Sequence, residues 1–204
     1  CILILMARLG LRPAEALHLE VKDIDLRGAG KIFIRTNKHF TPKSFCGYRK
    51  LPVRPFLLED EERFLRSFVR RRQTEVGKDT YRLLFSTYEF AGQLIDYEKL
   101  SAEASRLLSN YSGVHINLYQ LRHFALSCYQ LTCFASLARA QSWTGFDIAQ
   151  VEAIRRHFHQ APKEDVLSEI RSFAGHLTTH YLMSTYFHFS DILRYEAAMR
   201  VSHR

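Results

Sequence analysis

The sequence predicts a mainly helical domain with a small antiparallel β-sheet. Segments whose apolar residues recur at helical spacing cover most of the 204 residues. Two short strand-like segments, KIFIRT at 31–36 and YRKLPV at 48–53, flank a stretch that contains Gly and Pro, which is typical of a β-hairpin. Hydrophobic residues make up 47% and charged residues 25% of the chain, as in globular proteins, and we expect residues 1–204 to form one domain.

Two helices are predicted at the start of the chain, over residues 2–9 and 13–20. They meet at Gly10, and Pro13 suits the first position of the second helix, where a missing N–H costs nothing. The apolar residues that can share one face of the second helix are Ala14, Leu17 and Val21.

The predicted hairpin encloses a long loop, which we expect to be a mobile tip. Pro52 indicates that the second strand ends there or lies at a sheet edge, because proline cannot donate a ladder hydrogen bond. A charged amphipathic helix over 58–75 and a short strand over 83–86 are expected next. The remaining predicted helices, of which the second is mostly apolar and so buried, are 97–109, 118–138, 147–159, 164–174 and 190–200.

The charge balance favours a polyanionic partner. The 29 basic and 21 acidic residues leave a net charge of +8, and Lys and Arg gain affinity for DNA by releasing its counterions. No apolar run is long enough to span a membrane, so we expect no membrane association. Four cysteines without paired spacing indicate reduced thiols and a cytoplasmic protein. The apolar opening CILILMARLG is typical of a buried helix rather than a signal peptide, and we expect a further segment upstream.

Two arginines and a late tyrosine carry the chemistry. Arg12 lies in GLRPAE, Arg122 in LYQLRHF, and Tyr186 follows the AGH that contains His176. Cleaving a phosphodiester without a metal needs fixed cations for the phosphate oxygens, and arginine binds them bidentately and keeps its charge. A lysine or histidine can protonate the leaving oxygen, and a tyrosine ester conserves the bond energy that rejoining needs. The sequence lacks the clustered Asp and Glu pairs of a two-metal nuclease.

These motifs resemble those of the tyrosine recombinases of the phage-integrase type. GLRPAEALHLEVKDIDL is similar to the family's first arginine motif, with Arg12 as the arginine, and Glu15 is placed to hold Arg12 from the same helix face. LYQLRHFALS resembles H-x-L-R-H, with Arg122 as the second arginine and His123 after it, and SFAGHLTTHYLMSTYFH resembles L-G-H followed by the nucleophile. The likeness implies a catalytic domain of that fold, which such proteins usually carry after a separate helical DNA-binding domain.

The sequence departs from the family pattern at three places. Tyr119 stands where the first histidine of H-x-L-R-H is usual, and tyrosine is a poorer acid or base at neutral pH. Ala174 replaces the leucine of L-G-H. The stretch between the second arginine and His176 is longer than usual, so Ser142–Pro162 is expected to form an extra helical element.

The lysine and the nucleophile each have two candidates. The resemblance implies a general-acid lysine on the hairpin, which favours Lys38 and leaves Lys43 as the alternative. The family's spacing favours Tyr186, ten residues after the histidine, over Tyr181, five residues after it. The resemblance also implies that His176 donates a hydrogen bond to the phosphate.

Further basic residues are candidates for contacts with DNA. The sequence positions that we expect to touch phosphates are Lys43, Arg70, Arg71, Arg72 and His123, with Arg155 and Arg156 as weaker candidates. His176 and His180 stand at i and i+4, but the H-E-x-x-H context is missing and no third ligand is evident. We therefore expect no metal and no cofactor.

The resemblance predicts site-specific DNA recombination or integration through a 3′-phosphotyrosine, on double-stranded DNA and as a homotetramer on paired sites. Residues 190–204 are expected to pack against a neighbouring subunit. One alternative is strand relaxation of the type IB topoisomerase kind. Another is a DNA-binding relative that has lost catalysis, for which Tyr119 leaves room.

Overall fold

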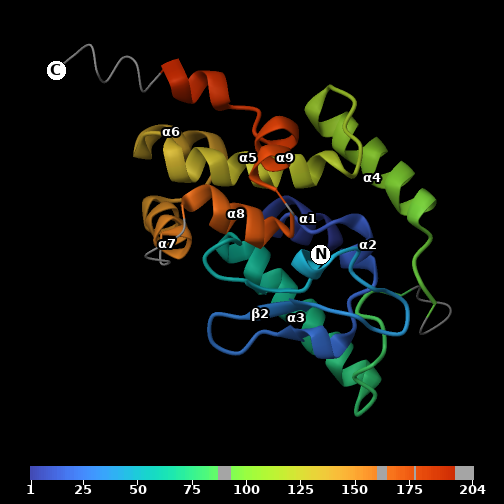
Figure 1. Cartoon of the computed structure of the whole chain (residues 1–204). Coiled ribbons are helices and arrows are strands. Elements are labelled where there is room, and N and C mark those ends of the chain that lie inside the picture. Colours follow the sequence, from blue (N-terminus) through green and yellow to red (C-terminus); the bar gives the residue numbers. More distant parts are fainter. Residues whose placement is uncertain (87–92, 160–164, 177, 196–204) are drawn as a thin grey trace. The chain divides into compact units, whose positions relative to one another are not determined.

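The fold was examined in a computed structural model that describes residues 1–86, 93–159, 165–176 and 178–195 (Figure 1). These residues form mostly helices and one three-stranded antiparallel sheet, which confirms the predicted fold class. The chain divides into two compact units, Cys1–Arg122 and His123–Arg204. The division falls within a single helix, so consecutive residues of one helix belong to different units.

The first unit opens with an apolar helix, α1 (Ile2–Leu9), as predicted. Its buried residues include Leu5 and Met6. The helix ends at Gly10, whose φ of 63° lies in the left-handed region, and the Gly10 N–H donates to the Met6 carbonyl at 3.1 Å. Glycine suits this position because a Cβ would clash there.

The second helix, α2 (Pro13–Leu17), is shorter than predicted. A 3-10 turn, η1 (Val21–Asp23), follows it, and Ala14 is exposed, so the predicted shared face of Ala14, Leu17 and Val21 was wrong. The cause is local. The Asp23 carboxylate accepts the Glu20 backbone N–H at 3.0 Å, and such a side-chain partner competes with continuation of the helix.

The sheet of the first unit has the order β1 (Ile24–Asp25), β2 (Lys31–Ile34) and β3 (Arg49–Pro52), with all pairings antiparallel. The predicted hairpin is therefore confirmed, and its register pairs the buried residues Ile32 and Leu51. Two residues are too few for β1 to show an alternating pattern in the sequence. The strand predicted over 83–86 is reduced to one bridge between Leu83 and Glu20.

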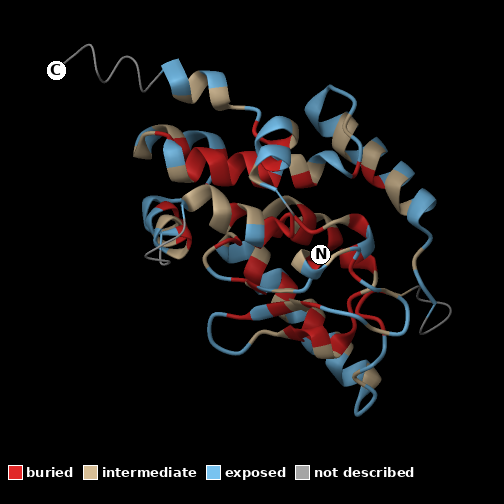
Figure 2. Cartoon of the chain, in the orientation of Figure 1, coloured by how far each residue is buried: buried red, intermediate tan, exposed pale blue. Residues whose placement is uncertain are grey.

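Two longer helices complete the described part of the first unit. α3 (Glu59–Val76) buries Leu65 and Val69, and α4 (Tyr97–Ser112) begins at Asp96, whose carboxylate accepts the N–H groups of the first turn. Both confirm the predicted helices at 58–75 and 97–109. Figure 2 shows that α4 is mostly exposed, and the buried residue along it is Ala104.

The helix predicted over 118–138 is two helices, α5 (Gln120–Phe134) and α6 (Leu137–Thr144). The Ser136 hydroxyl accepts the Arg139 N–H at 3.3 Å and begins the second helix. The Arg155 guanidinium donates to the carbonyls of Thr132 and Ala135 at 2.7 and 2.8 Å and satisfies the end of α5. Arg155 is thus engaged in helix capping.

Three further helices follow in the described part of the second unit, ahead of a last helical stretch: α7 (Ile148–Phe158), α8 (Val166–Ala174) and α9 (Thr179–Tyr186). The first two were predicted, and α7 supplies the helix expected within Ser142–Pro162; α9 was not predicted. The rings of Tyr129, Phe158 and Phe173 pack with centroids 5.3 to 5.5 Å apart. Residues 190–195 are helical, and the remainder of the predicted 190–200 helix lies outside the described residues. Among the described residues, no helix is long and apolar enough to cross a membrane.

Candidate active site

Arg12 and Glu15 form the first part of the site. Arg12 immediately precedes α2, and its Nη1 donates to Glu15 Oε1 at 2.7 Å. The Arg12 backbone N–H donates to Glu15 Oε2 at 2.8 Å, as in half of a capping box. The expectation that Glu15 holds Arg12 is confirmed. The Arg12 side chain is 30% exposed, whereas that of Glu15 is 2% exposed.

A second arginine, Arg49 of β3, binds the same carboxylate. Its Nη1 and Nη2 donate to Glu15 Oε1 and Oε2, both at 2.9 Å, and its side chain is only 6% exposed. The sequence analysis missed Arg49. The available signal was strand parity, because Arg49 lies two residues before buried Leu51 and so shares its face of the strand. A charged residue on a buried face needs a partner.

Arg122 is fully buried near the start of α5. Its Nη1 donates to the carbonyl of Gly10, the residue that ends α1. Burial alone would raise the pKa of Glu15, but the charge and hydrogen bonds of Arg49, followed by the charges of Arg12 and Arg122, lower it to about 2. The first unit therefore gathers both predicted arginines around one ionised carboxylate.

The candidate lysines lie in the hairpin loop, and both are exposed. Lys38 sits in a turn closed by a hydrogen bond from the Asn37 N–H to the Phe40 carbonyl at 2.9 Å. Asn37 Nδ2 donates to the carbonyl of His18 at 2.6 Å, and the Phe40 ring stacks on His18 at 5.7 Å. This end of the loop, expected to be a mobile tip, is thus tied to the end of α2, the helix that follows Arg12.

Lys43 lies farther along the same loop. It follows Pro42, which packs so closely against Gly47 that a Cβ at Gly47 would come within 2.7 Å of the proline Cβ. Of the two lysines, Lys38 is therefore the one whose turn is bonded to the end of α2.

Tyr119 is 37% exposed, and its carbonyl accepts the Arg122 backbone N–H at 3.0 Å in the turn that begins α5.

His176 is placed by the end of α8. Gly175 has a φ of 67°, its N–H donates to the Ser172 carbonyl, and the His176 N–H donates to the Arg171 carbonyl, both at 3.0 Å. This pair of bonds is a Schellman motif, which sets the direction in which the chain leaves the helix. The His176 side chain is buried and is 4% exposed.

Tyr186, the last residue of α9, contacts two histidine rings. The His176 ring stacks on it at 4.8 Å between centroids, and the His123 ring lies at 4.4 Å. Tyr186 is 1% exposed, whereas Tyr181 is 51% exposed and meets His176 and Tyr186 edge-on. Of the two candidate nucleophiles, Tyr186 is the one enclosed by histidines.

α5 also holds the backbone around Tyr186. The Ser127 hydroxyl donates to the Tyr186 carbonyl at 2.7 Å. Gln130 accepts the Phe189 N–H at 3.1 Å and donates to the Ser190 hydroxyl at 2.9 Å. His188 shares a 3.1 Å hydrogen bond with His123. The ring of His123 in turn contacts Tyr186, the tyrosine expected to be the nucleophile.

The three consecutive arginines of α3 differ in their exposure and in their contacts. Arg70 and Arg71 are exposed, and Arg71 pairs loosely with Glu75 at 3.6 Å. The side chain of Arg72 is 11% exposed and donates to the Leu83 carbonyl at 3.1 Å and to the Ser86 hydroxyl at 2.9 Å. Arg72 thus has a structural role within the first unit.

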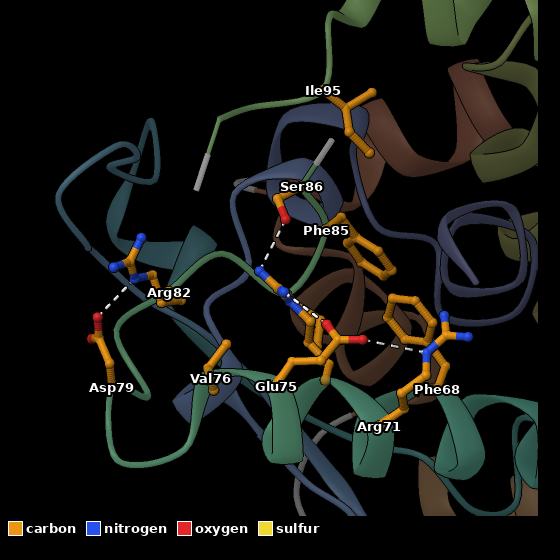
Figure 3. A pocket seen from close by; sticks show the side chains of 11 residues that line it. Phe68, Arg71, Glu75, Val76, Asp79, Arg82, Phe85, Ser86 and Ile95 are labelled. Atoms are coloured by element: carbon orange, nitrogen blue, oxygen red, sulfur yellow. Dashed lines mark hydrogen bonds and ion pairs between the residues drawn. The ribbon is translucent and has the colours of Figure 1, made fainter. Parts of the chain in front are cut away.

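Arg71 and Arg72 border a pocket of about 960 Å³ (Figure 3). The rings of Phe68 and Phe85 stack in it at 5.4 Å, and Arg71 and Arg82 lie at its edge, paired with Glu75 and Asp79. The pocket is lined by none of the residues predicted to be catalytic. Within the described residues there is also no group of three or more His, Cys, Asp or Glu that could hold a metal ion.

Three solved structures share the fold of the chain. XerA recombinase matches with a TM-score of 0.58 at 19% identity, over 98% of this chain and 56% of its own. The Tn1549 transposon integrase, in complex with transposon right-end DNA, matches with a TM-score of 0.57 at 17% identity, over 98% and 57%. XerH site-specific recombinase, bound to difH substrate, matches with a TM-score of 0.53 at 20% identity, over 97% and 45%.

The fold is that of a tyrosine-recombinase catalytic domain. The chain spans about half the length of these recombinases. No family model matches the chain, and no curated protein matches it. Within this recombinase fold the predicted residues fall into two groups, Arg12, Lys38, Tyr119 and Arg122 in the first unit and His123, His176 and Tyr186 in the second.

Proposed function

We propose that residues 1–204 are the catalytic domain of a tyrosine recombinase, which cleaves and rejoins double-stranded DNA through a 3′-phosphotyrosine. The observation that carries the proposal is Tyr186, held at the end of α9 against His176 and His123 in a recombinase fold. The structural neighbours include recombinases and an integrase solved with DNA, which supports the same class of partner. The net charge of +8 suits that partner.

In this proposal the arginines bind the scissile phosphate. Arg12 and Arg122 donate to its non-bridging oxygens, where negative charge grows in the transition state. The arrangement around Glu15 supports this role, because a carboxylate that orients Arg12 reduces the entropy lost when the guanidinium binds phosphate. Tyr119 lines the site at the start of α5.

Tyr186 is the proposed nucleophile. Its hydroxyl releases its proton to solvent, and the resulting phenolate oxygen forms the new bond to phosphorus. The bond from phosphorus to the 5′-oxygen breaks, and Lys38 gives that oxygen its proton. His176 donates a hydrogen bond to the phosphate. Because Tyr186 is 1% exposed, its hydroxyl must become accessible before it can attack a DNA strand.

Rejoining reverses these steps with the 5′-hydroxyl of another strand, so no external energy source is needed. We propose that the exchange takes place in a homotetramer on two DNA sites. Residues 190–204 are candidates for contact with a neighbouring subunit. Of these, residues 190–195 are helical, and residues 196–204 lie outside the described part of the chain.

Covalent trapping tests the proposal. The protein is incubated with fluorescent duplexes of randomised sequence, each carrying a nick near its centre, so that the short 5′-hydroxyl strand diffuses away after cleavage. We expect an adduct that survives SDS and disappears in Tyr186→Phe. Tyr181→Phe is the matched control, and it should retain the adduct because its side chain is half exposed at the other end of the same helix.

Two results would count against the proposal. An adduct that persists in Tyr186→Phe and vanishes in Tyr181→Phe would move the nucleophile to Tyr181. Absence of any adduct from folded protein that binds the same duplexes would indicate a DNA-binding relative without catalysis. Sequencing the trapped duplexes separates site-specific recombination from topoisomerase-like relaxation, which would show no preferred site.

A further inference from the structure

Arg49 differs from Arg12 in its exposure and its position. It lies on the buried face of β3, and its side chain is 6% exposed, against 30% for Arg12. A guanidinium whose two terminal nitrogens both bond to Glu15 is poorly placed to meet a ligand itself. Its effect on a bound phosphate must pass through another residue.

The Glu15 carboxylate shows which residue that is. An ionised carboxylate has about four acceptor positions, and here four N–H groups occupy them. Oε1 accepts from Arg12 Nη1 at 2.7 Å and Arg49 Nη1 at 2.9 Å, while Oε2 accepts from the Arg12 N–H at 2.8 Å and Arg49 Nη2 at 2.9 Å. Arg49 therefore fills half of the carboxylate and Arg12 fills the other half.

The charges of the group follow from this sharing. Glu15 and Arg12 alone would sum to zero, so the carboxylate that orients Arg12 would also cancel its attraction for a phosphate. With Arg49 the three side chains sum to one positive charge, to which Arg122 adds another. The arrangement lets Glu15 orient Arg12 while the group remains cationic.

We propose that Arg49 is a positioning residue that neutralises Glu15, so that Arg12 is both oriented and available to a phosphate. The proposal rests on the proposed function for its substrate, a DNA phosphodiester. Arg49 Nη1 also donates to the Gly47 carbonyl at 3.0 Å, so the same guanidinium connects α2 to the hairpin that carries Lys38. A lysine keeps the charge but lacks the planar fork that makes these parallel contacts.

Four variants test the proposal: Arg49→Met, Arg49→Lys, Glu15→Gln and the double variant Arg49→Met/Glu15→Gln. We expect Arg49→Met to slow covalent adduct formation about 10- to 100-fold, by analogy with the loss seen when residues that orient metal-ligating side chains are removed. Arg49→Lys should lose less. Adding Glu15→Gln to Arg49→Met should restore the rate by more than about twofold, the smallest coupling usual for charges in contact.

Rescue by Glu15→Gln separates the proposal from direct binding of the phosphate by Arg49, because removing a second charge would not restore the rate if Arg49 bound the phosphate itself. A merely structural role would lower the rate only as far as it lowers the folded fraction, which circular dichroism at the assay temperature measures. The double variant also removes the buried unpaired carboxylate that could prevent Arg49→Met from folding. Arg27→Met is the control, because Arg27 is a 91% exposed arginine of the same sheet region, and its rate should match the wild type.

A second measurement does not depend on cleavage. Inorganic phosphate should raise the Tm of the wild type, because a ligand that binds only the folded state stabilises it. The rise should shrink in Arg49→Met, recover in part in the double variant and be unchanged in Arg27→Met. If the Tm values follow this pattern but no adduct forms, the proposed function is wrong and the role of Arg49 stands. A Tm rise that is absent in the wild type, or the same in Arg49→Met, would overturn the role of Arg49.

Discussion

At the scale of single residues, Glu15 sets how the arginine group responds to acid. Its folded pKa of about 2 lies below its ordinary 4.5, so its contribution to stability is present above pH 4.5 and is lost as the pH falls toward 2. The difference corresponds to about 3 kcal/mol in full, of which about 2 kcal/mol should disappear between pH 5 and pH 3. Urea unfolding at the two pH values measures it.

The matched variant for this prediction is Glu15→Gln. It should be less stable than the wild type at pH 7, because Arg12 and Arg49 then lose the carboxylate to which they bond. It should also lose less stability on acidification. Equal losses of unfolding free energy in the two proteins between pH 5 and pH 3 would show that another acid group carries the effect.

The residues predicted from the sequence were those whose partners lie nearby in the chain. Glu15 is three positions from Arg12 on one helix, so their contact follows from helical spacing. Arg49 is 34 positions away, and its contact depends on the register of the hairpin against α2, which local patterns do not contain. For the same reason the contact between His188 and His123, which lie 65 positions apart, was not predicted.

At the scale of elements, the end of α8 determines where His176 lies. Gly175→Ala should destabilise the protein by about 1–2 kcal/mol, because the left-handed backbone brings a Cβ close to the following carbonyl. Gly175→Asn should lose less, since asparagine tolerates that conformation. Tm values of both variants measure the effect, and an equal loss in both would point to packing rather than backbone strain.

Element boundaries were the part of the fold that the sequence predicted least well. The apolar run through α5 and α6 has continuous helical periodicity, so only the Ser136 cap and the bonds of Arg155 separate the two helices. α9 escaped prediction because only Leu182 and Tyr186 of its eight residues are buried, so it has no strong apolar stripe. The hairpin was predictable because its strands and loop carry local signals.

At the scale of the whole molecule, the net charge of +8 predicts salt-dependent binding to duplex DNA. The logarithm of the binding constant should fall linearly with the logarithm of the salt concentration, because phosphate contacts release counterions. We expect the exposed Arg71 to contact a phosphate. Arg71→Ala should therefore reduce the magnitude of that slope by about 1. Fluorescence anisotropy over a range of NaCl concentrations measures the slope.

Arg72→Ala is the internal control for this measurement. Arg72 belongs to the same run but bonds to the Leu83 carbonyl and Ser86, so its replacement should lower the Tm and leave the salt slope unchanged. A slope that responds to Arg72 and not to Arg71 would reverse this assignment of roles.

The shared carboxylate of Glu15 has a consequence for how relatives of this protein diverge. Arg12 and Arg49 divide the acceptor positions of Glu15 between them. A lineage that loses Arg49 keeps a buried carboxylate that cancels the charge of Arg12 and lacks half of its hydrogen-bond donors. A lineage that loses Glu15 keeps two neighbouring arginines that repel each other. Either single change should be selected against until the other follows. Positions 15 and 49 are therefore expected to covary among relatives, while Arg12 stays constant.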